Sequence, residues 1–165
     1  MDRIDIFIAA YLRDHFTEET IKYVKERTKS PYRLFLLDNG GNEKFRTDVD
    51  FYIKFGSNLG IHACWNTALA LAESDYFITT DNDLLVPELE PDWLEQMYEI
   101  ARSNPDYGAI SMHPHVFIGA AGVDPNAPEK IVERNMCGAV FRIMRRAAVE
   151  QARGWEHKID PGRNH

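Results

Sequence analysis

The fold of this chain is decided by residues 75–87, which read DYFITTDNDLLVP. The first half of this stretch is apolar, aromatic and β-branched, as is typical of a buried strand. The strand ends at two carboxylates, Asp81 and Asp83, with one residue between them. Ligands of open α/β sheets bind outside the carboxyl ends of the strands, so this position favours a polar ligand site. Asp and Asn also favour turns, and a plain turn at this point is the alternative.

Apolar runs bounded by turn residues recur on both sides of this strand. They alternate with amphipathic segments of helical period, and such alternation is typical of a mainly parallel sheet covered by helices on both faces. The predicted fold class is therefore α/β, a three-layer sandwich with a mainly parallel central sheet. We expect residues 1–165 to form one domain. The other strands are expected at 4–10, 32–37, 50–55, 107–112 and 137–144.

Helix boundaries are predicted from capping residues and prolines. Thr17 is expected to cap the first helix, with Phe16 and Ile21 packed across its start as a hydrophobic staple. Pro91 suits the first position of a later helix. Ile61 is expected to begin another helix and to belong to its buried stripe, together with Trp65, Ala68, Leu69 and Ala72. The predicted helices cover residues 17–28, 61–72, 91 to at least 101, and 145–153.

Composition and charge exclude several classes of protein. The 26 acidic residues outnumber the 19 basic ones, for a formal net charge of −7, which argues against bulk electrostatic binding to nucleic acid or to anionic membranes. No apolar run approaches the length of about 18 residues that a membrane span needs, and the N-terminus lacks the pattern of a signal peptide. Cys64 and Cys137 are isolated, as expected of reduced thiols in a cytoplasmic protein.

Three strand ends are expected to meet at one edge of the sheet. Tyr11 follows the first strand, Asp38 ends the second, and Asp81 and Asp83 end the strand quoted above. An aromatic ring and a carboxylate suit a base or a ribose, while paired carboxylates suit a hard divalent cation that holds phosphate. Each residue taken singly also has a structural explanation, since Asp38 precedes a turn and Tyr11 can simply pack.

One helix adds two further candidates beside this crevice. His62 and Asn66 are four residues apart, so they lie on the same helix face, at the border of the apolar stripe. They are expected to face the cleft together. A surface or capping histidine is the alternative for His62.

Five motifs follow one another in order along the chain. They are Ala-Ala-Tyr-Leu at 9–12, Leu-Leu-Asp-Asn-Gly at 36–40, Asn-Leu-Gly at 58–60 with Asn66, Asp-Asn-Asp at 81–83 before Pro87, and Gly-Ala-Val-Phe-Arg at 138–142 before Arg145 and Arg146. This ordered set resembles the GT-A nucleotide-sugar glycosyltransferases of the family 2 type. An Asp-x-Asp motif alone is a weak signal, but the set covers nearly the whole chain.

The resemblance implies a metal-dependent glycosyltransferase that moves a sugar from a nucleotide-diphosphate-sugar of the UDP, GDP or dTDP type to an unidentified acceptor, with inversion. It implies that Asp83 is the main ligand of Mn²⁺ or Mg²⁺ and that Asp81 contacts the ribose or the metal. It also implies that His165 completes the metal shell, a frayed terminus being the alternative for His165. By the same resemblance, Tyr11 and Asp38 contact the base. The implied nucleotide-sugar-binding residues are Ala10, Tyr11, Asp38, Asn58, His62, Asn66, Asp81 and Asn82.

The sequence departs from the family pattern at two places. Trp65 stands where the family usually has an arginine. The family's catalytic base usually follows the Gly-Trp region in an acidic motif, near where this chain stops at His165. The base is therefore absent, supplied by Glu156 or Asp160, or lost by truncation of a longer protein, and we favour truncation or a minimal form. A nucleotide-sugar-binding module or pseudoenzyme without a base is the alternative function.

Three other enzyme classes lack their motifs in this sequence. A sugar-phosphate nucleotidyltransferase needs a Gly-rich loop after the first strand, and a dehydrogenase needs Gly-x-Gly-x-x-Gly there. The histidines at 62, 113, 115 and 157 do not show the His-Glu-x-x-His spacing of a zinc hydrolase. The sequence predicts neither the acceptor nor the oligomeric state.

Overall fold

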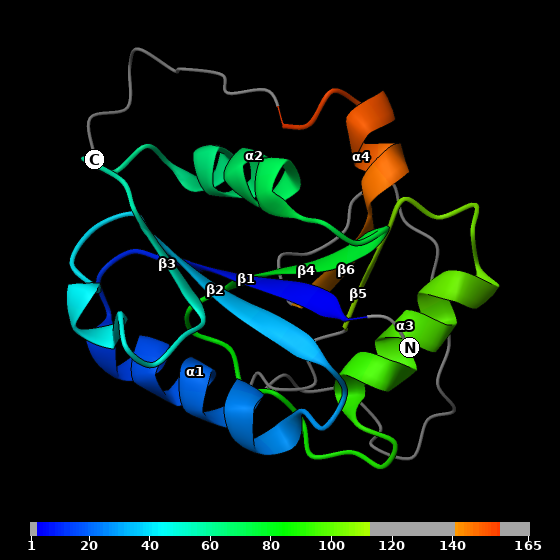
Figure 1. The fold of residues 1–165 in the computed structure, drawn as a ribbon, viewed down its shortest axis with the longest axis horizontal. Coiled ribbons are helices and arrows are strands. Elements are labelled where there is room, and N and C mark those ends of the chain that lie inside the picture. Colours follow the sequence, from blue (N-terminus) through cyan, green and yellow to red (C-terminus); the bar gives the residue numbers. More distant parts are fainter. Residues whose placement is uncertain (1–2, 113–140, 156–165) are drawn as a thin grey trace, which may run out of the picture.

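The computed structural model describes residues 3–112 and 141–155. Within them, six strands form one sheet in the order β3-β2-β1-β4-β6-β5 (Figure 1). β1 pairs in parallel with β2 on one side and with β4 on the other, and β3 extends the parallel part. β6 runs antiparallel to both β4 and β5. The predicted, mainly parallel sheet is confirmed. The strands are β1 (Ile4–Ala10), β2 (Tyr32–Asp38), β3 (Phe51–Lys54), β4 (Tyr76–Asp81), β5 (Ala109–Ser111) and β6 (Arg142–Arg145).

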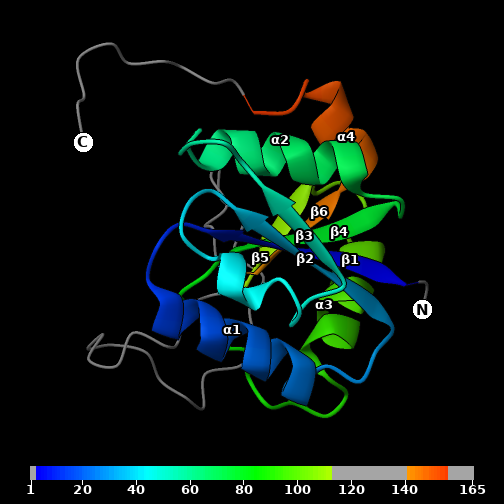
Figure 2. The ribbon, with the colours of Figure 1, turned by 60° about the vertical axis from the view of Figure 1, so that its left-hand side comes forward.

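Helices cover both faces of this sheet, which confirms the three-layer sandwich (Figures 1 and 2). α1 (Asp14–Arg27) and α3 (Trp93–Ser103) lie on one face, and α2 (Ile61–Leu71) and α4 (Arg146–Gln151) on the other. All seven residues of β1 are buried because both faces are covered. Alternate side chains of β1 enter separate cores: Ile6 packs on the α1 and α3 side, and Phe7 on the α2 and α4 side.

The chain leaves β1 and β3 towards opposite faces of the sheet. α1 follows β1 on one face and leads to the neighbouring strand β2, whereas α2 follows β3 on the other face and leads to β4. The connections therefore diverge between β1 and β4, and a crevice opens there at the carboxyl ends of the strands.

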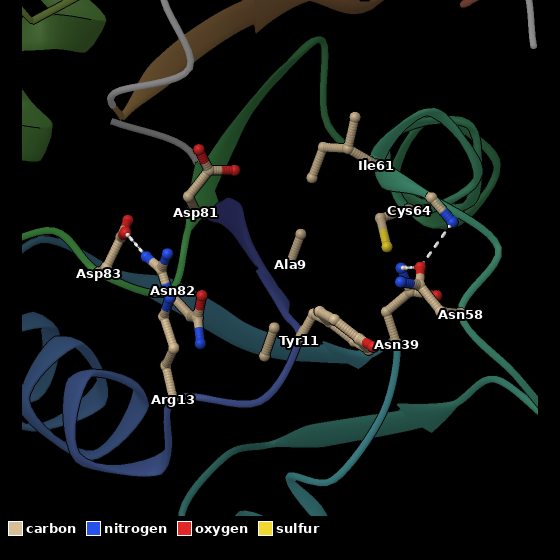
Figure 3. A pocket seen from close by; sticks show the side chains of 12 residues that line it. Ala9, Tyr11, Arg13, Asn39, Asn58, Ile61, Cys64, Asp81, Asn82 and Asp83 are labelled. Carbon is tan, nitrogen blue, oxygen red and sulfur yellow. Dashed lines mark hydrogen bonds and ion pairs between the residues drawn. The ribbon is translucent and has the colours of Figure 1, made fainter. Parts of the chain in front are cut away.

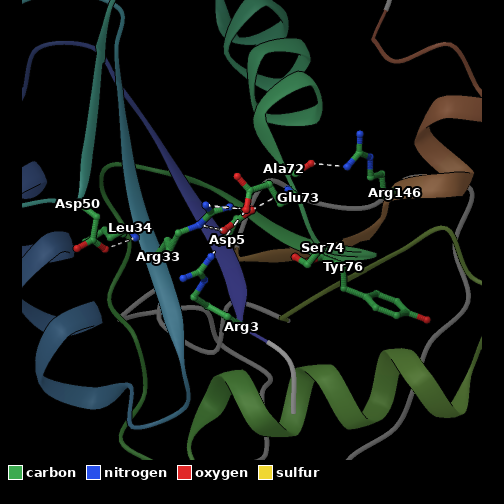
Figure 4. Close-up of polar contacts among 10 residues, drawn as sticks. All are labelled: Arg3, Asp5, Arg33, Leu34, Asp50, Ala72, Glu73, Ser74, Tyr76 and Arg146. Atoms are coloured by element: carbon green, nitrogen blue, oxygen red, sulfur yellow. Dashed lines mark hydrogen bonds and ion pairs between the residues drawn. The ribbon is translucent and has the colours of Figure 1, made fainter.

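An ion-pair network centred on a buried carboxylate lies at the opposite end of the sheet (Figure 4). Asp5 of β1 is 1% exposed and accepts from Arg33 Nε at 2.6 Å and Nη2 at 2.8 Å. Arg33 also pairs with Glu73 at 2.9 Å, and the Glu73 backbone N–H donates to Asp5. The network links the amino-terminal ends of β1 and β2 to the segment before β4. Because the crevice lies at the carboxyl ends of the strands, these charges lie away from it.

Two predicted helix starts are wrong. α1 begins at Asp14, three residues before the predicted cap, with Arg13 at the N-cap position. Thr17 lies inside the helix, fully buried, where its hydroxyl donates to Asn42 Oδ1 at 3.0 Å, so it is no cap and the staple across Phe16 does not form. The local capping signal is overridden by this tertiary hydrogen bond.

α3 also starts later than the proline signal predicts. Asp92 is its N-cap and accepts from the backbone N–H groups of Leu94 and Glu95, which places Pro91 outside the helix. Ile61 begins α2 as predicted, but its side chain is 40% exposed and does not join the buried stripe. The predicted start of the sixth strand, residues 137–140, lies outside the described residues. In the described part of the chain, no helix is long and apolar enough to cross a bilayer.

Candidate functional site

A cavity of about 360 Å³ opens at the carboxyl ends of β1 and β4, where α2 begins (Figure 3). Six of the residues predicted from the sequence line it, so the fold brings these residues together at the expected edge of the sheet. Asp38, His62 and Asn66 do not line it. Asp160 and His165 lie outside the described residues. The predicted residues on the cavity wall are Ala10, Tyr11, Asn58, Asp81, Asn82 and Asp83.

Two carboxylates form the acidic end of the cavity. Burial at the end of β4, reinforced by the charge of Asp83, raises the pKa of Asp81 to about 6, against the opposing effect of Arg142. Asp83 lies beyond the strand and pairs with Arg13 at 2.7 Å. Hard divalent cations prefer carboxylate oxygens, and a cation here would relieve the repulsion between Asp81 and Asp83, so the pair fits Mg²⁺ or Mn²⁺.

The described residues supply these two carboxylates but no cluster of three or more metal-ligating side chains. Among the described residues, a cation at this site would have two carboxylate ligands, and water and phosphate oxygens can supply others. That is the usual coordination of Mg²⁺ in phosphate sites, where one or two carboxylates act together with the substrate.

Asn82 fixes the turn that carries both carboxylates. It is 7% exposed, and its Nδ2 donates to Thr17 Oγ1 at 2.7 Å and to the Leu12 carbonyl at 3.1 Å. The Thr20 hydroxyl donates to the Asn82 carbonyl at 3.0 Å. Both threonines belong to α1, so the turn after β4 is tied to the helix that follows β1.

An amide pair forms the other end of the cavity. Asn39 Nδ2 donates to Asn58 Oδ1 at 2.7 Å, and the backbone N–H of Leu59 donates to Asn39 Oδ1 at 2.8 Å. The N–H of Gly60 donates to Asn58 Oδ1 at 2.9 Å. Because a backbone N–H can only donate, these contacts fix which atom of each amide is oxygen. Tyr11, 48% exposed, stands beside this pair at the cavity wall (Figure 3).

Asp38 shapes the loop beneath the cavity. It is fully buried and accepts from the backbone N–H groups of Gly40 at 2.9 Å and Asn42 at 3.2 Å, and from the Tyr52 hydroxyl. Burial, together with the hydrogen bond to Asp38, raises the pKa of Tyr52. With these partners the carboxylate holds the turn after β2 in place, and its contact with a base stays a prediction.

Asn66 faces the segment after α4 rather than the cavity. Its Oδ1 accepts from the Trp155 N–H, and its Nδ2 donates to the Trp155 carbonyl, both at 2.9 Å. Gly154 makes this approach possible, because a Cβ there would lie 2.5 Å from Asn66 Oδ1. Its φ of +72° also favours glycine. Asn66 therefore anchors Trp155 to α2. His62 lies on the same helix, half-buried.

Several cavity residues were not predicted. Arg13 is the one with the clearest signal, a cation two residues after Tyr11 in a loop expected at the crevice. Asn39 directly follows the predicted Asp38, and Cys64 gives no polar signal: burial raises its thiol pKa to about 12, so it stays protonated. Ala9, Gly60 and Ile61 also line the cavity.

A second cation lies close to the position where the resemblance implies an arginine. The Arg142 guanidinium of β6 lies 5.0 Å from the centre of the Trp65 ring and 6.0 Å from that of Trp155. Its Nε donates to Thr79 Oγ1 at 3.2 Å. A positive charge is thus present beside Trp65, although it comes from β6 and not from α2.

Comparison with known families gives one match over most of the chain. The model described as glycosyl transferase family 2 matches residues 5–126. A comparison with curated protein sequences gives no match.

Solved structures, among them one of a mannosyltransferase, share the fold. The mannosyltransferase PcManGT from Pyrobaculum calidifontis, in complex with GDP-Man and Mn²⁺, superposes with a TM-score of 0.68 at 15% identity, over 93% of this chain and 47% of that one. TarS of S. aureus, residues 1–349, gives 0.60 at 14% identity over 92% of this chain and 49% of that one. Full TarS gives 0.65 at 14% identity, covering 91% and 29%. This chain thus spans half or less of their length.

Proposed function

The chain belongs to glycosyl transferase family 2, and on this premise we propose that it transfers a sugar from a nucleotide-diphosphate-sugar to an acceptor. The observation that carries the proposal is the cavity between the carboxyl ends of β1 and β4, where the connections diverge. It has Asp81 and Asp83 at one end and Tyr11 towards the other. Such a cavity can take a charged diphosphate at its acidic end, through a cation, and a flat base at its aromatic end.

We propose that Asp81 and Asp83 hold Mn²⁺ or Mg²⁺ against the diphosphate of the donor. The similar fold of PcManGT, whose structure was solved in complex with GDP-Man and Mn²⁺, supports this proposal. When bound, the cation neutralises the charge that develops on the departing nucleoside diphosphate. Asn82 contributes by keeping both carboxylates on the same turn, through its hydrogen bonds to the Leu12 carbonyl and to Thr17 of α1.

The acceptor side of the reaction requires a base. We propose an inverting transfer, in which the acceptor hydroxyl oxygen attacks the anomeric carbon as its proton passes to a carboxylate and the bond to the diphosphate oxygen breaks. Asp81 and Asp83 are the carboxylates on the described cavity wall, and both are assigned to the cation. Asp160 is therefore our candidate for the base, with Glu156 as the other acidic residue of that segment.

The proposal is tested by calorimetry with UDP-, GDP- and dTDP-sugars, each with and without Mn²⁺. We expect one donor to bind in a metal-dependent manner. We expect Asp83→Ala to lose this metal-dependent binding. Asp106→Ala is the matched control, because it removes an exposed carboxylate of the loop between α3 and β5. Metal-independent binding, or unchanged binding by Asp83→Ala, contradicts the proposal.

A nucleotide-sugar-binding module without catalysis is the second candidate. It is favoured by the absence, on the cavity wall of the described residues, of an acidic residue beyond Asp81 and Asp83. Donor binding with neither sugar transfer nor donor hydrolysis by the full chain supports this candidate. Turnover that is lost in Asp160→Asn excludes it and supports the transferase.

A further inference from the structure

Arg13 is the cationic side chain on the cavity wall formed by the described residues. Its Nη1 donates to Asp83 Oδ2 at 2.7 Å, across 70 positions of sequence (Figure 3). Asp83 is one of the two carboxylates assigned above to the cation. The guanidinium thus lies against an oxygen that the metal would take.

The backbone of Arg13 is held in place while its side chain is open to solvent. Leu12 and Arg13 both have φ of 54°, and the Arg13 carbonyl accepts from the N–H groups of Phe16 and Thr17 at the start of α1. The side chain of Arg13 is 62% exposed. The guanidinium can therefore change partner by rotating about its side-chain bonds, with no movement of the loop.

The charges at this end of the cavity determine what the guanidinium contacts when a donor is bound. Paired with Asp83, Arg13 offsets one of the two carboxylate charges. A divalent cation on Asp81 and Asp83 would repel a guanidinium paired with the same oxygens. The diphosphate brought by that cation offers acceptor oxygens close by, and the planar guanidinium matches phosphate geometry with two parallel hydrogen bonds.

We propose that Arg13 binds the diphosphate of the donor, and that it exchanges Asp83 for the diphosphate oxygens when the metal-bound donor enters. This inference rests on the proposed function. The net charge of the cluster is unchanged by the exchange, because a divalent cation and a diphosphate diester add equal and opposite charge. The ion pair with Asp83 that Arg13 gives up is weak, because exposed ion pairs contribute little to stability.

The exchange predicts effects of opposite sign in one variant. Arg13→Ala of the full chain removes a competitor for Asp83, so affinity for Mn²⁺ alone, followed by loss of the free Mn²⁺ electron paramagnetic resonance signal, rises by up to about fivefold. The same variant loses a charge-assisted hydrogen bond. Its affinity for the nucleoside diphosphate that the wild type binds, whether UDP, GDP or dTDP, therefore falls by about tenfold or more at saturating Mn²⁺. Arg13→Lys keeps the charge but lacks the planar guanidinium, so we expect its nucleotide affinity to lie between those of the wild type and Arg13→Ala.

Lys44→Ala is the matched control. Lys44 forms a comparable exposed ion pair with Asp14 at 2.9 Å, outside the cavity, so both affinities stay unchanged. Unaltered circular dichroism and urea midpoints show that the variants fold. If Arg13→Ala lowers both affinities together, or changes neither while the wild type binds nucleotide, the exchange is wrong and the proposed function stands. If the wild type binds none of UDP, GDP and dTDP with Mn²⁺, the proposed function fails and the exchange fails with it.

Discussion

Replacing Asn82 with alanine tests whether the turn that carries the two carboxylates depends on its middle residue. The variant loses two hydrogen bonds, from Asn82 Nδ2 to Thr17 Oγ1 at 2.7 Å and to the Leu12 carbonyl at 3.1 Å. At about 1 kcal/mol for each bond, the free energy of unfolding falls by about 2 kcal/mol. For a chain of this size that corresponds to a decrease in Tm of about 4–8 °C.

The assay is urea unfolding followed by circular dichroism, with the midpoint and slope fitted separately so that a change in stability is distinguished from a change in exposed surface. Gln96→Ala is the control, because it removes an exposed amide that donates to the Pro91 carbonyl at 2.7 Å. We expect it to change stability by less than about 0.5 kcal/mol.

A second readout links Asn82 to the site. When its amide is lost, Asp81 and Asp83 are no longer held on one turn, so Mn²⁺ affinity also falls. The reasoning is refuted if Asn82→Ala is destabilised by no more than Gln96→Ala, since two buried or part-buried hydrogen bonds would then contribute nothing.

Two further predictions concern stability. Gly154→Ala places a Cβ 2.5 Å from Asn66 Oδ1 at a φ of +72°, so we expect the free energy of unfolding in urea to fall by about 1–3 kcal/mol. Gly56→Ala, where a Cβ meets nothing within 4 Å, is expected to be close to neutral. Equal effects of the two substitutions would contradict this account. Burial, with the charge of Asp83, raises the pKa of Asp81 to about 6, so the native state holds this proton more tightly than the unfolded chain. The free energy of unfolding of the metal-free protein should therefore fall as pH rises from about 4 to about 6, and a slope unchanged in Asp81→Asn would disprove this origin.

The strands and the edge of the sheet that carries the site were predictable because their signals are local. β1 and β4 are short runs, rich in apolar and β-branched residues, that are largely buried on both faces of the sheet. Parallel pairing then brings Tyr11 and Asp81 to the same edge of the sheet, which needs no knowledge of side-chain contacts.

The starts of α1 and α3 and the partner of Arg13 were not predictable in this way. Thr17 has the residue type of a cap, but its hydroxyl serves Asn42 and Asn82, which lie 25 and 65 positions away. Arg13 reaches Asp83 across 70 positions. Contacts of this separation depend on the packed tertiary structure, and a window of sequence around either residue contains no trace of them.

The middle residue of Asp81-Asn82-Asp83 has a different physical role from its neighbours, and that role explains the choice of an amide. Its Nδ2 meets two oxygens, the Leu12 carbonyl and Thr17 Oγ1, so the position requires a donor. An aspartate there would set an acceptor against the carbonyl and bury a third negative charge between two carboxylates. A leucine of similar size would leave the Leu12 carbonyl without this donor. Asparagine supplies the donors without the charge, which lets α1 hold the turn while both flanking carboxylates remain on the cavity wall.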